Sequence, residues 1–228
     1  MGEMTQLRAN DNHELMAYVA RPKSEPIGAV VVVQEIFGVN GHIRSVADRF
    51  AAEGFLAIAP ALFDRIERDV ELTYGGDDLK RAFELMQKLS PATALKDVAA
   101  AYELAESSGK GVGVVGFCYG GLMSWLTATR GEAERIQPGC CVAYYPGGIG
   151  KFATEEPSCP VMVHFGAQDT HIGKDQIEAV RSAHPEVEIF VYEGAEHAFN
   201  RDVGASYHAA SAGVAWKRTV DFLKLHIA

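Results

Sequence analysis

Short unbroken apolar runs alternate along the chain with segments whose apolar residues recur every three or four positions. A run rich in β-branched residues indicates a strand buried on both faces, and the three-to-four spacing indicates the buried side of a helix. The predicted strands are 28–34, 55–60, 111–117, 139–145, 159–166 and 187–192. The predicted helices are 43–53, 78–89, 92–107, a segment after 118, 172–183 and 206–228. This alternation predicts an α/β fold with a mainly parallel central sheet and helices on both faces.

Two segments depart from this alternation. Residues 1–27 alternate polar and apolar positions and contain Pro22 and Pro26, which predicts antiparallel edge strands and a turn. Residues 61–76 are irregular and polar, so we expect a loop that overhangs a site, and whether it acts as a lid stays open. No stretch resembles a linker between two cores, and residues 1–228 are therefore interpreted as one domain.

The composition narrows the function classes. With 48% hydrophobic and 22% charged residues, the chain can form a substantial core. A formal net charge of −9 argues against nucleic acid as a partner. No apolar run approaches the ~18 residues of a membrane span, and the N-terminal residues lack a signal-peptide pattern. We therefore expect no membrane partner and a cytoplasmic location. The oligomeric state stays open, with a monomer as one option.

The cysteines also bear on the class of protein. Cys118, Cys140, Cys141 and Cys159 lack the paired spacing of a metal site. The adjacent pair, Cys140 and Cys141, is expected to point to opposite faces of a strand. Reduced thiols without a bound metal are therefore the better interpretation.

Residues 111–121 combine a predicted strand, a sharp turn and a helix. Gly-Phe-Cys-Tyr-Gly at 116–120 has the pattern of a G-x-S-x-G nucleophile elbow with cysteine in place of serine. Gly116 and Gly120 are needed where a Cβ would collide with the neighbouring strand or helix. The turn exposes Cys118, and the N-terminal end of the next helix favours its thiolate form, which is the nucleophile.

A buried structural cysteine is the alternative at this position, because most free cysteines act as small hydrophobic residues. The flanking glycines and the strand-to-helix context favour a nucleophile at Cys118. Glutamine amidotransferase-like and DJ-1-like proteins also place a cysteine at such a turn. The partners of the cysteine must therefore decide between these classes.

Two residues follow later predicted strands in the way that catalytic partners would. Asp169 comes after the strand that ends at 166, and His197 comes after the strand that ends at 192. Functional residues of parallel sheets collect at the carboxyl ends of the strands. The order Cys118, Asp169, His197 is that of the α/β-hydrolase fold. We expect Cys118 to attack a carbonyl, His197 to move the proton, and Asp169 to fix the imidazole tautomer and stabilise its charged form.

Each partner has a rival. His171 lies two residues after Asp169 but does not follow a strand end, and His164 lies inside a predicted strand, which is typical of a core residue. Glu196 is the rival acid, but adjacent side chains diverge, so it is poorly placed to orient His197. A turn-forming Asp169 and a surface-loop His197 are the structural alternatives.

These residues together resemble the dienelactone hydrolase, or carboxymethylenebutenolidase, family of the α/β-hydrolase superfamily. The resemblance covers nearly the whole chain. It rests on Gln-Glu-Ile-Phe-Gly at 34–38, the cysteine elbow, the turn at 166–169 and Glu-His-Ala-Phe at 196–199. It implies a hydrolase that opens a small anionic enol lactone, converting dienelactone to maleylacetate in the degradation of chlorinated aromatic compounds, without metal or cofactor.

The resemblance also assigns roles that no pattern reveals. It implies that Glu35 interacts with the thiol of Cys118 and helps to generate the thiolate, which a buried carboxylate would do by proton transfer. The backbone N–H groups of Ile36 and Tyr119 would form the oxyanion hole. From the residue pattern alone, Glu35 could equally be a solvated loop residue.

Substrate-binding residues follow from the same resemblance. Arg201 matches a family arginine that binds the substrate carboxylate, a role that suits the guanidinium fork. An exposed surface arginine is the alternative. We expect Phe37 and Tyr145 to be further substrate contacts.

The chain also departs from the family pattern. Leu79 stands where the well-studied members carry a second substrate-binding arginine, and Lys80 and Arg81 are adjacent to it. Ala198 stands where those members have serine. These changes leave the hydrolase chemistry intact but bear on which lactone is bound.

Two alternatives to the lactone hydrolase stay open. One is a broader carboxylesterase or thioesterase of the same fold. The other is a non-catalytic thiol sensor or ligand binder, in which Cys118 is oxidised rather than acylated. The order of Cys118, Asp169 and His197 argues against a sensor, because a sensor needs no proton shuttle. A papain-like arrangement with Asn200 is disfavoured, because the cysteine there opens a helix without a preceding buried strand.

Overall fold

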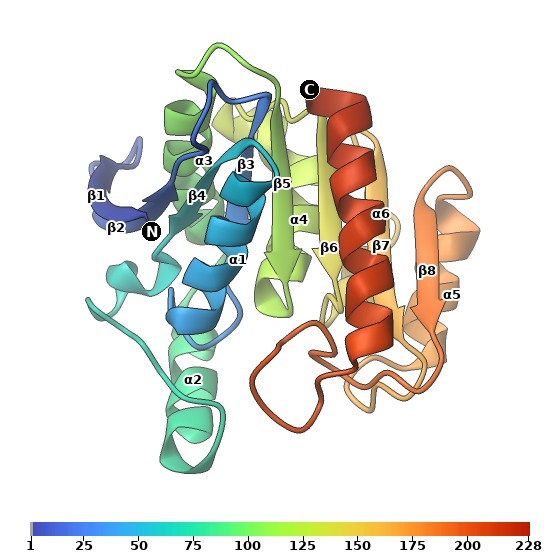
Figure 1. The fold of residues 1–228 in the computed structure, drawn as a ribbon. Helices are drawn as coiled ribbons and strands as arrows, with labels where there is room; N and C mark the ends of the chain where they lie inside the picture. Colours follow the sequence, from blue (N-terminus) through green and yellow to red (C-terminus); the bar gives the residue numbers. More distant parts are fainter. Residues whose placement is uncertain (1) are drawn as a thin grey trace.

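The computed structural model describes residues 2–228. Within these residues, eight strands join one sheet in the order β1-β2-β4-β3-β5-β6-β7-β8 (Figure 1). The strands are β1 (Glu3–Arg8), β2 (Glu14–Ala20), β3 (Gly28–Val33), β4 (Phe55–Pro60), β5 (Val112–Phe117), β6 (Cys140–Tyr144), β7 (Val161–Gly166) and β8 (Glu188–Tyr192). β1 and β2 pair antiparallel at one edge, and β4 through β8 run parallel with β3. The predicted α/β sheet and its antiparallel edge strands are confirmed.

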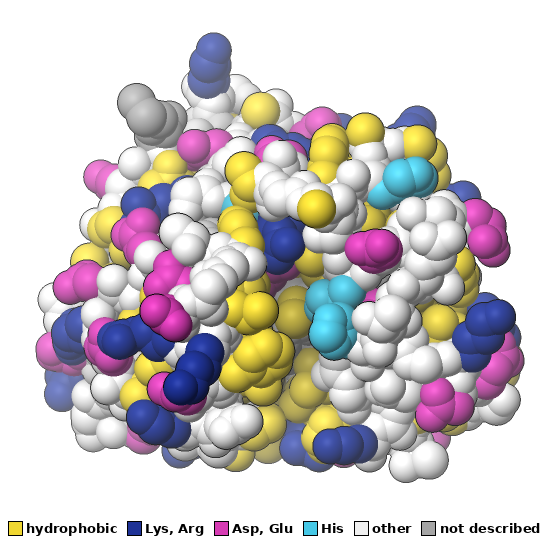
Figure 2. Space-filling model, turned by 90° about the horizontal axis from the view of Figure 1, so that it is seen from below, with side chains coloured by type: hydrophobic (Ala, Val, Ile, Leu, Met, Phe, Trp, Pro, Cys, Tyr) yellow, Lys and Arg dark blue, Asp and Glu magenta, His cyan; other side chains and the backbone are white. Residues whose placement is uncertain are grey.

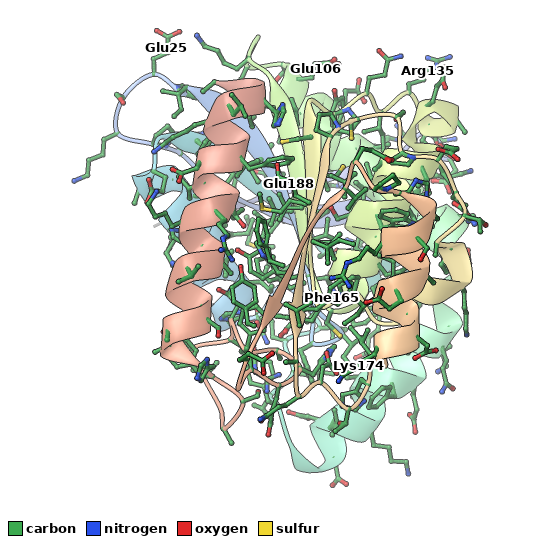
Figure 3. All side chains as sticks on the ribbon, turned by 90° about the vertical axis from the view of Figure 1, so that its right-hand side faces the viewer. Glu25, Glu106, Arg135, Phe165, Lys174 and Glu188 are labelled. Carbon is green, nitrogen blue, oxygen red and sulfur yellow. The ribbon has the colours of Figure 1, made fainter. Side chains whose placement is uncertain are left out.

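Helices cover both faces of this sheet. The α-helices are α1 (Gly41–Ala52), α2 (Gly76–Lys88), α3 (Pro91–Glu106), α4 (Tyr119–Arg130), α5 (Lys174–Ala183) and α6 (Ala209–Ile227). α1 and α6 lie in front of the sheet in Figure 1, and α3 and α4 lie behind it. Figure 3 views the sheet from its β8 edge, with α6 and α5 on opposite sides and the buried Phe165 between them. The interior strands are buried along their whole length because helices cover both of their faces.

Three of the predicted segments differ in detail in the structure. The last helix begins at Ala209 rather than at residue 206. The second and third helices are separate, and the break between them falls at Leu89 and Ser90. Pro91 is the first residue of α3, where its missing N–H costs nothing, and Ser90 caps that helix by accepting from the Thr93 N–H (3.2 Å). The loop 61–76 contains one short 3-10 helix, η1 (Leu62–Arg65).

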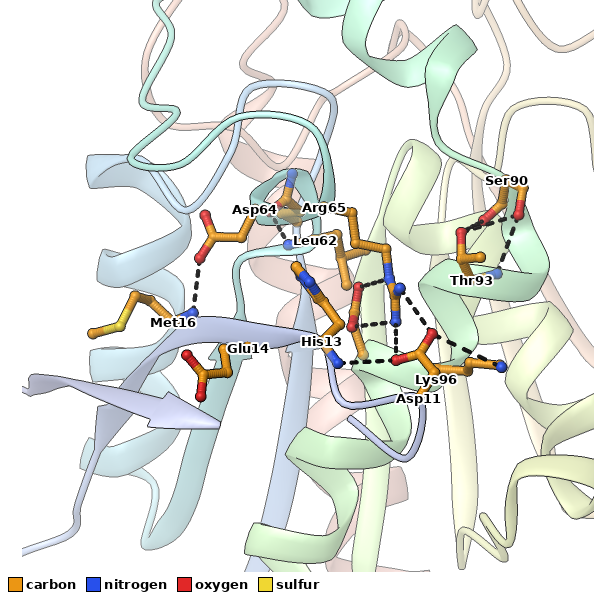
Figure 4. Close-up of polar contacts among 12 residues, drawn as sticks. Asp11, His13, Glu14, Met16, Leu62, Asp64, Arg65, Ser90, Thr93 and Lys96 are labelled. Carbon is orange, nitrogen blue, oxygen red and sulfur yellow. Dashed lines mark hydrogen bonds and ion pairs between the residues drawn. The ribbon is translucent and has the colours of Figure 1, made fainter. Parts of the chain in front are cut away.

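Arg65 ties the N-terminal hairpin to the rest of the fold (Figure 4). Its guanidinium donates to both oxygens of Asp97 in α3, at 2.7 and 2.9 Å, and to both oxygens of Asp11 in the β1–β2 turn, at 2.9 and 3.2 Å. Asp97 is completely buried. Burial raises the pKa of Asp97 to about 7, although the Arg65 contacts act in the opposite direction. Arg65, which lies in η1, therefore joins η1 to α3 through the buried Asp97 and to the β1–β2 turn through Asp11.

The carboxyl ends of the parallel strands meet at the lower edge of the sheet in Figure 1. Gln34, just after β3, is buried there and accepts from the Leu62 N–H (3.1 Å), which joins the loops after β3 and β4. No helix among residues 2–228 is long and apolar enough to span a membrane. The loops at this edge hold the residues described next.

Candidate active site

Cys118 lies at the sharp turn between β5 and α4. Its backbone has φ 54° and ψ −113°, a conformation that L-residues rarely adopt and that costs on the order of 1–3 kcal/mol. A Cβ on Gly116 would collide with the carbonyl of Gly120, and a Cβ on Gly120 would collide with the carbonyl of Val33. The two glycines thus let α4 start directly against the ends of β5 and β3. The sharp strand-to-helix turn that the elbow pattern predicts is present.

Cys118, His197 and Asp169 form one line of contacts across three loops. His197 Nε2 lies 3.2 Å from Cys118 Sγ, and His197 Nδ1 lies 2.7 Å from Asp169 Oδ2. The side chain of Asp169 is 1% exposed and that of His197 is 18% exposed. A line of this kind can pass a proton between sulfur and imidazole while the carboxylate orients the ring.

Backbone N–H groups hold Asp169 in place. The N–H groups of His171 and Ile172 donate to Asp169 Oδ1 at 2.8 and 3.1 Å, which leaves Oδ2 for His197. The rival acid, Glu196, is exposed to solvent. His171 itself is exposed, and its ring lies edge-on to that of His197 with centroids 5.1 Å apart. Asp169 is therefore the carboxylate in contact with His197.

His164 occupies the core, as its position inside a strand predicts. It is completely buried, with Nδ1 2.9 Å from the Tyr192 hydroxyl and Nε2 3.1 Å from the Thr219 hydroxyl. Burial lowers the pKa of His164 to about 3, so this imidazole stays neutral.

The surroundings of His197 favour its charged form. Burial alone lowers the pKa of His197, but the hydrogen bonds to Asp169 and Cys118 outweigh it and raise that pKa to about 10. Part of this rise comes from the cysteine, so the proton affinity of His197 depends on the state of the sulfur.

Glu35 is a buried carboxyl group without a hydrogen-bond partner among the described residues. It follows β3, the residue is among those that line the same cavity as Cys118, and it is 2% exposed. Burial raises the pKa of Glu35, and the nearby His42, Arg201 and His197 act to lower it. A buried carboxylate with no partner has a high affinity for a proton, and this chemistry suits proton transfer.

The predicted oxyanion donors, Ile36 and Tyr119, both line the cavity beside Cys118. Tyr119 is the first residue of α4, so its N–H has no acceptor within the helix. The backbone N–H groups of Ile36 and Tyr119 donate to no other group in the described part of the chain. Both are therefore free to bind a ligand oxygen.

Cys118 and His197 open into a cavity of about 730 Å³ at the carboxyl edge of the sheet. Figure 2 looks into this edge and shows a hollow in which hydrophobic side chains lie between a basic side chain and histidine. Arg201 lines the cavity, and its guanidinium lies 4.0 Å from the ring centroid of Tyr74 and 5.9 Å from that of Phe37. It donates to the Val203 carbonyl (3.1 Å) and to the Ser206 hydroxyl (3.2 Å). The aromatic rings and these acceptors hold the guanidinium at the cavity.

Tyr145 does not lie at the cavity, where a substrate contact would have to be. It is completely buried, is not among the residues that line the cavity, and packs behind His197 with ring centroids 5.1 Å apart. The strand end placed it near the site, but its ring turns into the core. Its position fits support of the His197 ring, and Phe37 remains at the cavity.

Residues of α2 and of the loop before it also line the cavity; among them the sequence singled out only Leu79, at the position of the family's second arginine. Tyr74 comes from the loop before α2, and Leu79 and Phe83 come from α2 itself. Lys80 and Arg81 are exposed and do not line the cavity. The four-residue spacing of Leu79 and Phe83 was a visible signal, but such spacing normally marks the buried side of a helix.

The residues described by the structure, 2–228, include no group of three or more His, Cys, Asp and Glu side chains that could hold a metal ion. The mostly parallel sheet, the nucleophile elbow and a His–Asp contact on later loops define an α/β hydrolase. The model of the dienelactone hydrolase family matches residues 15–227, and the chain belongs to that family.

Relatives agree with this assignment. The chain is 36% identical over 232 residues to an Escherichia coli (strain K12) protein assigned as a carboxymethylenebutenolidase, covering 91% of this chain and 81% of the relative. It is 30% identical over 227 residues to the carboxymethylenebutenolidase of Pseudomonas knackmussii, covering 95% and 94%. A crystal structure from Klebsiella pneumoniae assigned as a dienelactone hydrolase superposes with a TM-score of 0.82 at 34% identity, covering 97% and 98%. The protein is thus a hydrolase that acts on carboxylic esters.

Proposed function

We propose that the protein hydrolyses an anionic lactone or ester through a thioester on Cys118. The observation that carries this proposal is the line from Cys118 through His197 to Asp169, which opens into a cavity that also contains Arg201. Arg201 would pair with the carboxylate of the substrate. The name of the Pseudomonas relative makes a dienelactone the first substrate to test, with maleylacetate as the product.

The first half of the reaction forms the thioester. The Cys118 thiolate adds to the ester carbonyl carbon, and the backbone N–H groups of Ile36 and Tyr119 stabilise the resulting oxyanion. The carbon–oxygen bond of the ester then breaks, and the leaving oxygen takes its proton from the imidazolium of His197. In an enol lactone the leaving group is an enol, which becomes the ketone.

Glu35 supplies the proton acceptor that makes the thiolate in this scheme. Its buried carboxylate has no hydrogen-bond partner among the described residues, and the residue is among those that line the cavity with Cys118. When a bound substrate carboxylate pairs with Arg201, the positive charge near Glu35 is compensated, and the carboxylate becomes a stronger base. The thiol proton then passes to Glu35.

The second half releases the product. The hydrogen bond and charge of Cys118 help to raise the pKa of His197, so acylation of the sulfur removes part of that effect. The imidazole can then accept a proton from water. The activated water attacks the thioester carbon, the carbon–sulfur bond breaks, and the acid product leaves with the thiolate restored.

The remaining features of the proposal concern partners and location. The substrate is a small molecule, and no metal or cofactor takes part in the scheme. A catalytic thiol must stay reduced, which supports a cytoplasmic location.

Steady-state hydrolysis of cis- and trans-dienelactone beside p-nitrophenyl acetate tests the proposal, with Cys118→Ala as the inactive variant. Cys159→Ala is the matched control, because Cys159 is a second partly exposed free cysteine that does not line the cavity. We expect Cys118→Ala to lose turnover and Cys159→Ala to keep it. Mass spectrometry of the quenched reaction should show the acyl group on Cys118.

Other outcomes favour other functions. Activity on p-nitrophenyl acetate alone keeps the thioester mechanism and replaces the lactone by a broader ester class. Turnover that survives in Cys118→Ala refutes the nucleophile. No turnover, together with oxidation of Cys118 by peroxide, supports the thiol sensor.

A further inference from the structure

The cavity beside Cys118 is larger than a small charged lactone needs. Its volume is about 730 Å³. Cavities of roughly 300–1,000 Å³ hold drug-sized ligands, whereas a dienelactone has only about ten non-hydrogen atoms. A small lactone seated at Cys118 and Arg201 would therefore leave part of the cavity unfilled.

One wall of this additional space comes from α2. Leu79, Phe83 and Met86 line the cavity, and their spacing of four and three residues puts them on one side of the helix, here named the α2 face. Leu79 is 37% exposed and Phe83 is 41% exposed. Figure 1 shows why: α2 projects beyond the carboxyl ends of the strands. When a ligand covers large apolar side chains of this kind, apolar surface is removed from water, and this burial stabilises the complex.

The apolar surface continues from the α2 face to the nucleophile. Leu122 in α4 lines the cavity one turn after Cys118, and its backbone N–H donates to the Cys118 carbonyl (3.1 Å). Phe152, in the 3-10 helix η3 (Ile149–Phe152), lines the same cavity. An apolar group attached to the reacting ester would therefore stay in contact with apolar side chains from Cys118 outward.

No charged residue of α2 lines the cavity, whose charged lining residues are Glu35, Lys151, Glu196 and Arg201. Lys80 and Arg81 of α2 are exposed outside it, and Arg81 pairs with Glu67. Arg201 lies on the loop after β8 instead, and its guanidinium is beside the ring of Tyr74. The cavity thus offers one guanidinium for an anionic group and a separate apolar surface on α2.

We propose that the preferred substrates are anionic carboxylic esters with an extended apolar arm, which lies against the α2 face while the anionic group pairs with Arg201. This inference rests on the proposed function and names the substrate class of that same site. The occupant is the substrate because the α2 face is continuous with the cavity that contains Cys118.

Hydrolysis of p-nitrophenyl hexanoate and p-nitrophenyl acetate tests an arm on the acyl side of the ester. Hexyl and methyl hydrogen succinate test an arm on the alcohol side. Each methylene that becomes buried should raise kcat/KM about threefold to fourfold. We therefore expect the long ester to exceed the short one by at least about tenfold in one series.

Two variants show whether α2 causes the preference. Phe83→Ala should reduce the ratio of kcat/KM for the long ester to that for the short ester by several fold. Val214→Ala is the matched control, because Val214 is a 47% exposed apolar residue on α6 that does not line the cavity. It should leave the ratio unchanged.

Binding provides a readout that does not need turnover. Calorimetry should show that octanoate binds at least about tenfold more tightly than butyrate, and that Phe83→Ala removes this difference. Equal dissociation constants for the two acids would overturn the inference. Tighter octanoate binding without any hydrolysis would keep the apolar arm and refute the proposed function.

Two further outcomes also go against the inference. Cys118-dependent hydrolysis with no chain-length preference in either series would overturn it and leave the proposed function standing. Sedimentation could instead show a dimer that Phe83→Ala dissociates without changing the chain-length ratio. The α2 face would then be a contact between two copies of the chain.

Discussion

Replacing Asp169 by asparagine tests whether the buried acid sets the proton position on His197. In the structure, two backbone N–H groups point at Asp169 Oδ1, and Oδ2 lies 2.7 Å from His197 Nδ1. An asparagine fits the same space, but its oxygen must take the Oδ1 position because both backbone groups are donors. Its NH₂ group then faces Nδ1, which can accept only if it carries no proton. The imidazole proton moves to Nε2, the atom that faces Cys118 Sγ.

This wrong tautomer has a calculable consequence. Protonated Nε2 cannot accept a proton from water, and the charged form of His197 loses the carboxylate that helps to raise its pKa to about 10. The corresponding change in serine triads lowers kcat by about 10⁴, which is ~5.4 kcal/mol of activation free energy. We expect a loss of roughly 10³–10⁴ in Asp169→Asn, with the thermal midpoint nearly unchanged.

The assay is steady-state hydrolysis of p-nitrophenyl acetate across pH, with thermal unfolding of the same samples. Asp175→Asn is the control. Asp175 is an exposed aspartate on α5, close to Asp169 in the sequence, and it does not line the cavity. It should retain full activity. A loss smaller than about tenfold in Asp169→Asn, with an unchanged pH profile, would refute the tautomer argument.

Three further predictions concern stability. Burial raises the pKa of Glu35 above its ordinary value of 4.5, so its contribution to stability is present below that value and is lost as pH rises. Glu35→Gln should therefore unfold at a higher temperature than wild type near neutral pH, and this difference should vanish toward pH 4.5. An equal rise in the unfolding temperature at every pH would contradict a raised Glu35 pKa. Arg65→Met leaves Asp97 buried without its cation, so denaturant unfolding should show that the free energy of unfolding falls by about 3 kcal/mol. The fall should be larger in alkali than in acid, and adding Asp97→Asn to Arg65→Met should recover part of it. Gly120→Ala forces a Cβ against the Val33 carbonyl and should cost about 1–3 kcal/mol, whereas Gly213→Ala, with open space around it, should not destabilise; similar midpoints for both would argue against a tight elbow.

The sheet could be predicted because strands buried on both faces need unbroken apolar runs, and their boundaries agree within two residues. The start of α6 was predicted too early. Residues 206–208 instead fold back on the site: Ser206 accepts from Arg201, and the His208 N–H donates to the Phe199 carbonyl (3.0 Å). These contacts join loop segments without any periodic pattern, so the sequence carries no signal for them.

The residues around Cys118 show the same difference between what the sequence predicts and what it does not. Cys118, Asp169 and His197 follow strand ends, and topology alone brings strand ends together. Tyr145 also follows a strand end, but a backbone with φ 36° turns its ring into the core. The spacing of the α2 face was visible, yet spacing does not reveal whether a helix side packs on the core or lines a cavity. That distinction depends on how far α2 projects from the sheet.

The nucleophile elbow is a property of the backbone and of two glycines rather than of the sulfur. Gly116 and Gly120 let α4 approach β3, and the turn at Cys118 is held by its N–H donating to the Tyr144 carbonyl (3.0 Å). None of these constraints involves the thiol, so a hydroxyl could occupy the same position without rebuilding the turn. The geometry of the turn is therefore separable from the side chain at position 118, and a single base change between cysteine and serine codons would exchange a thiol for a hydroxyl there.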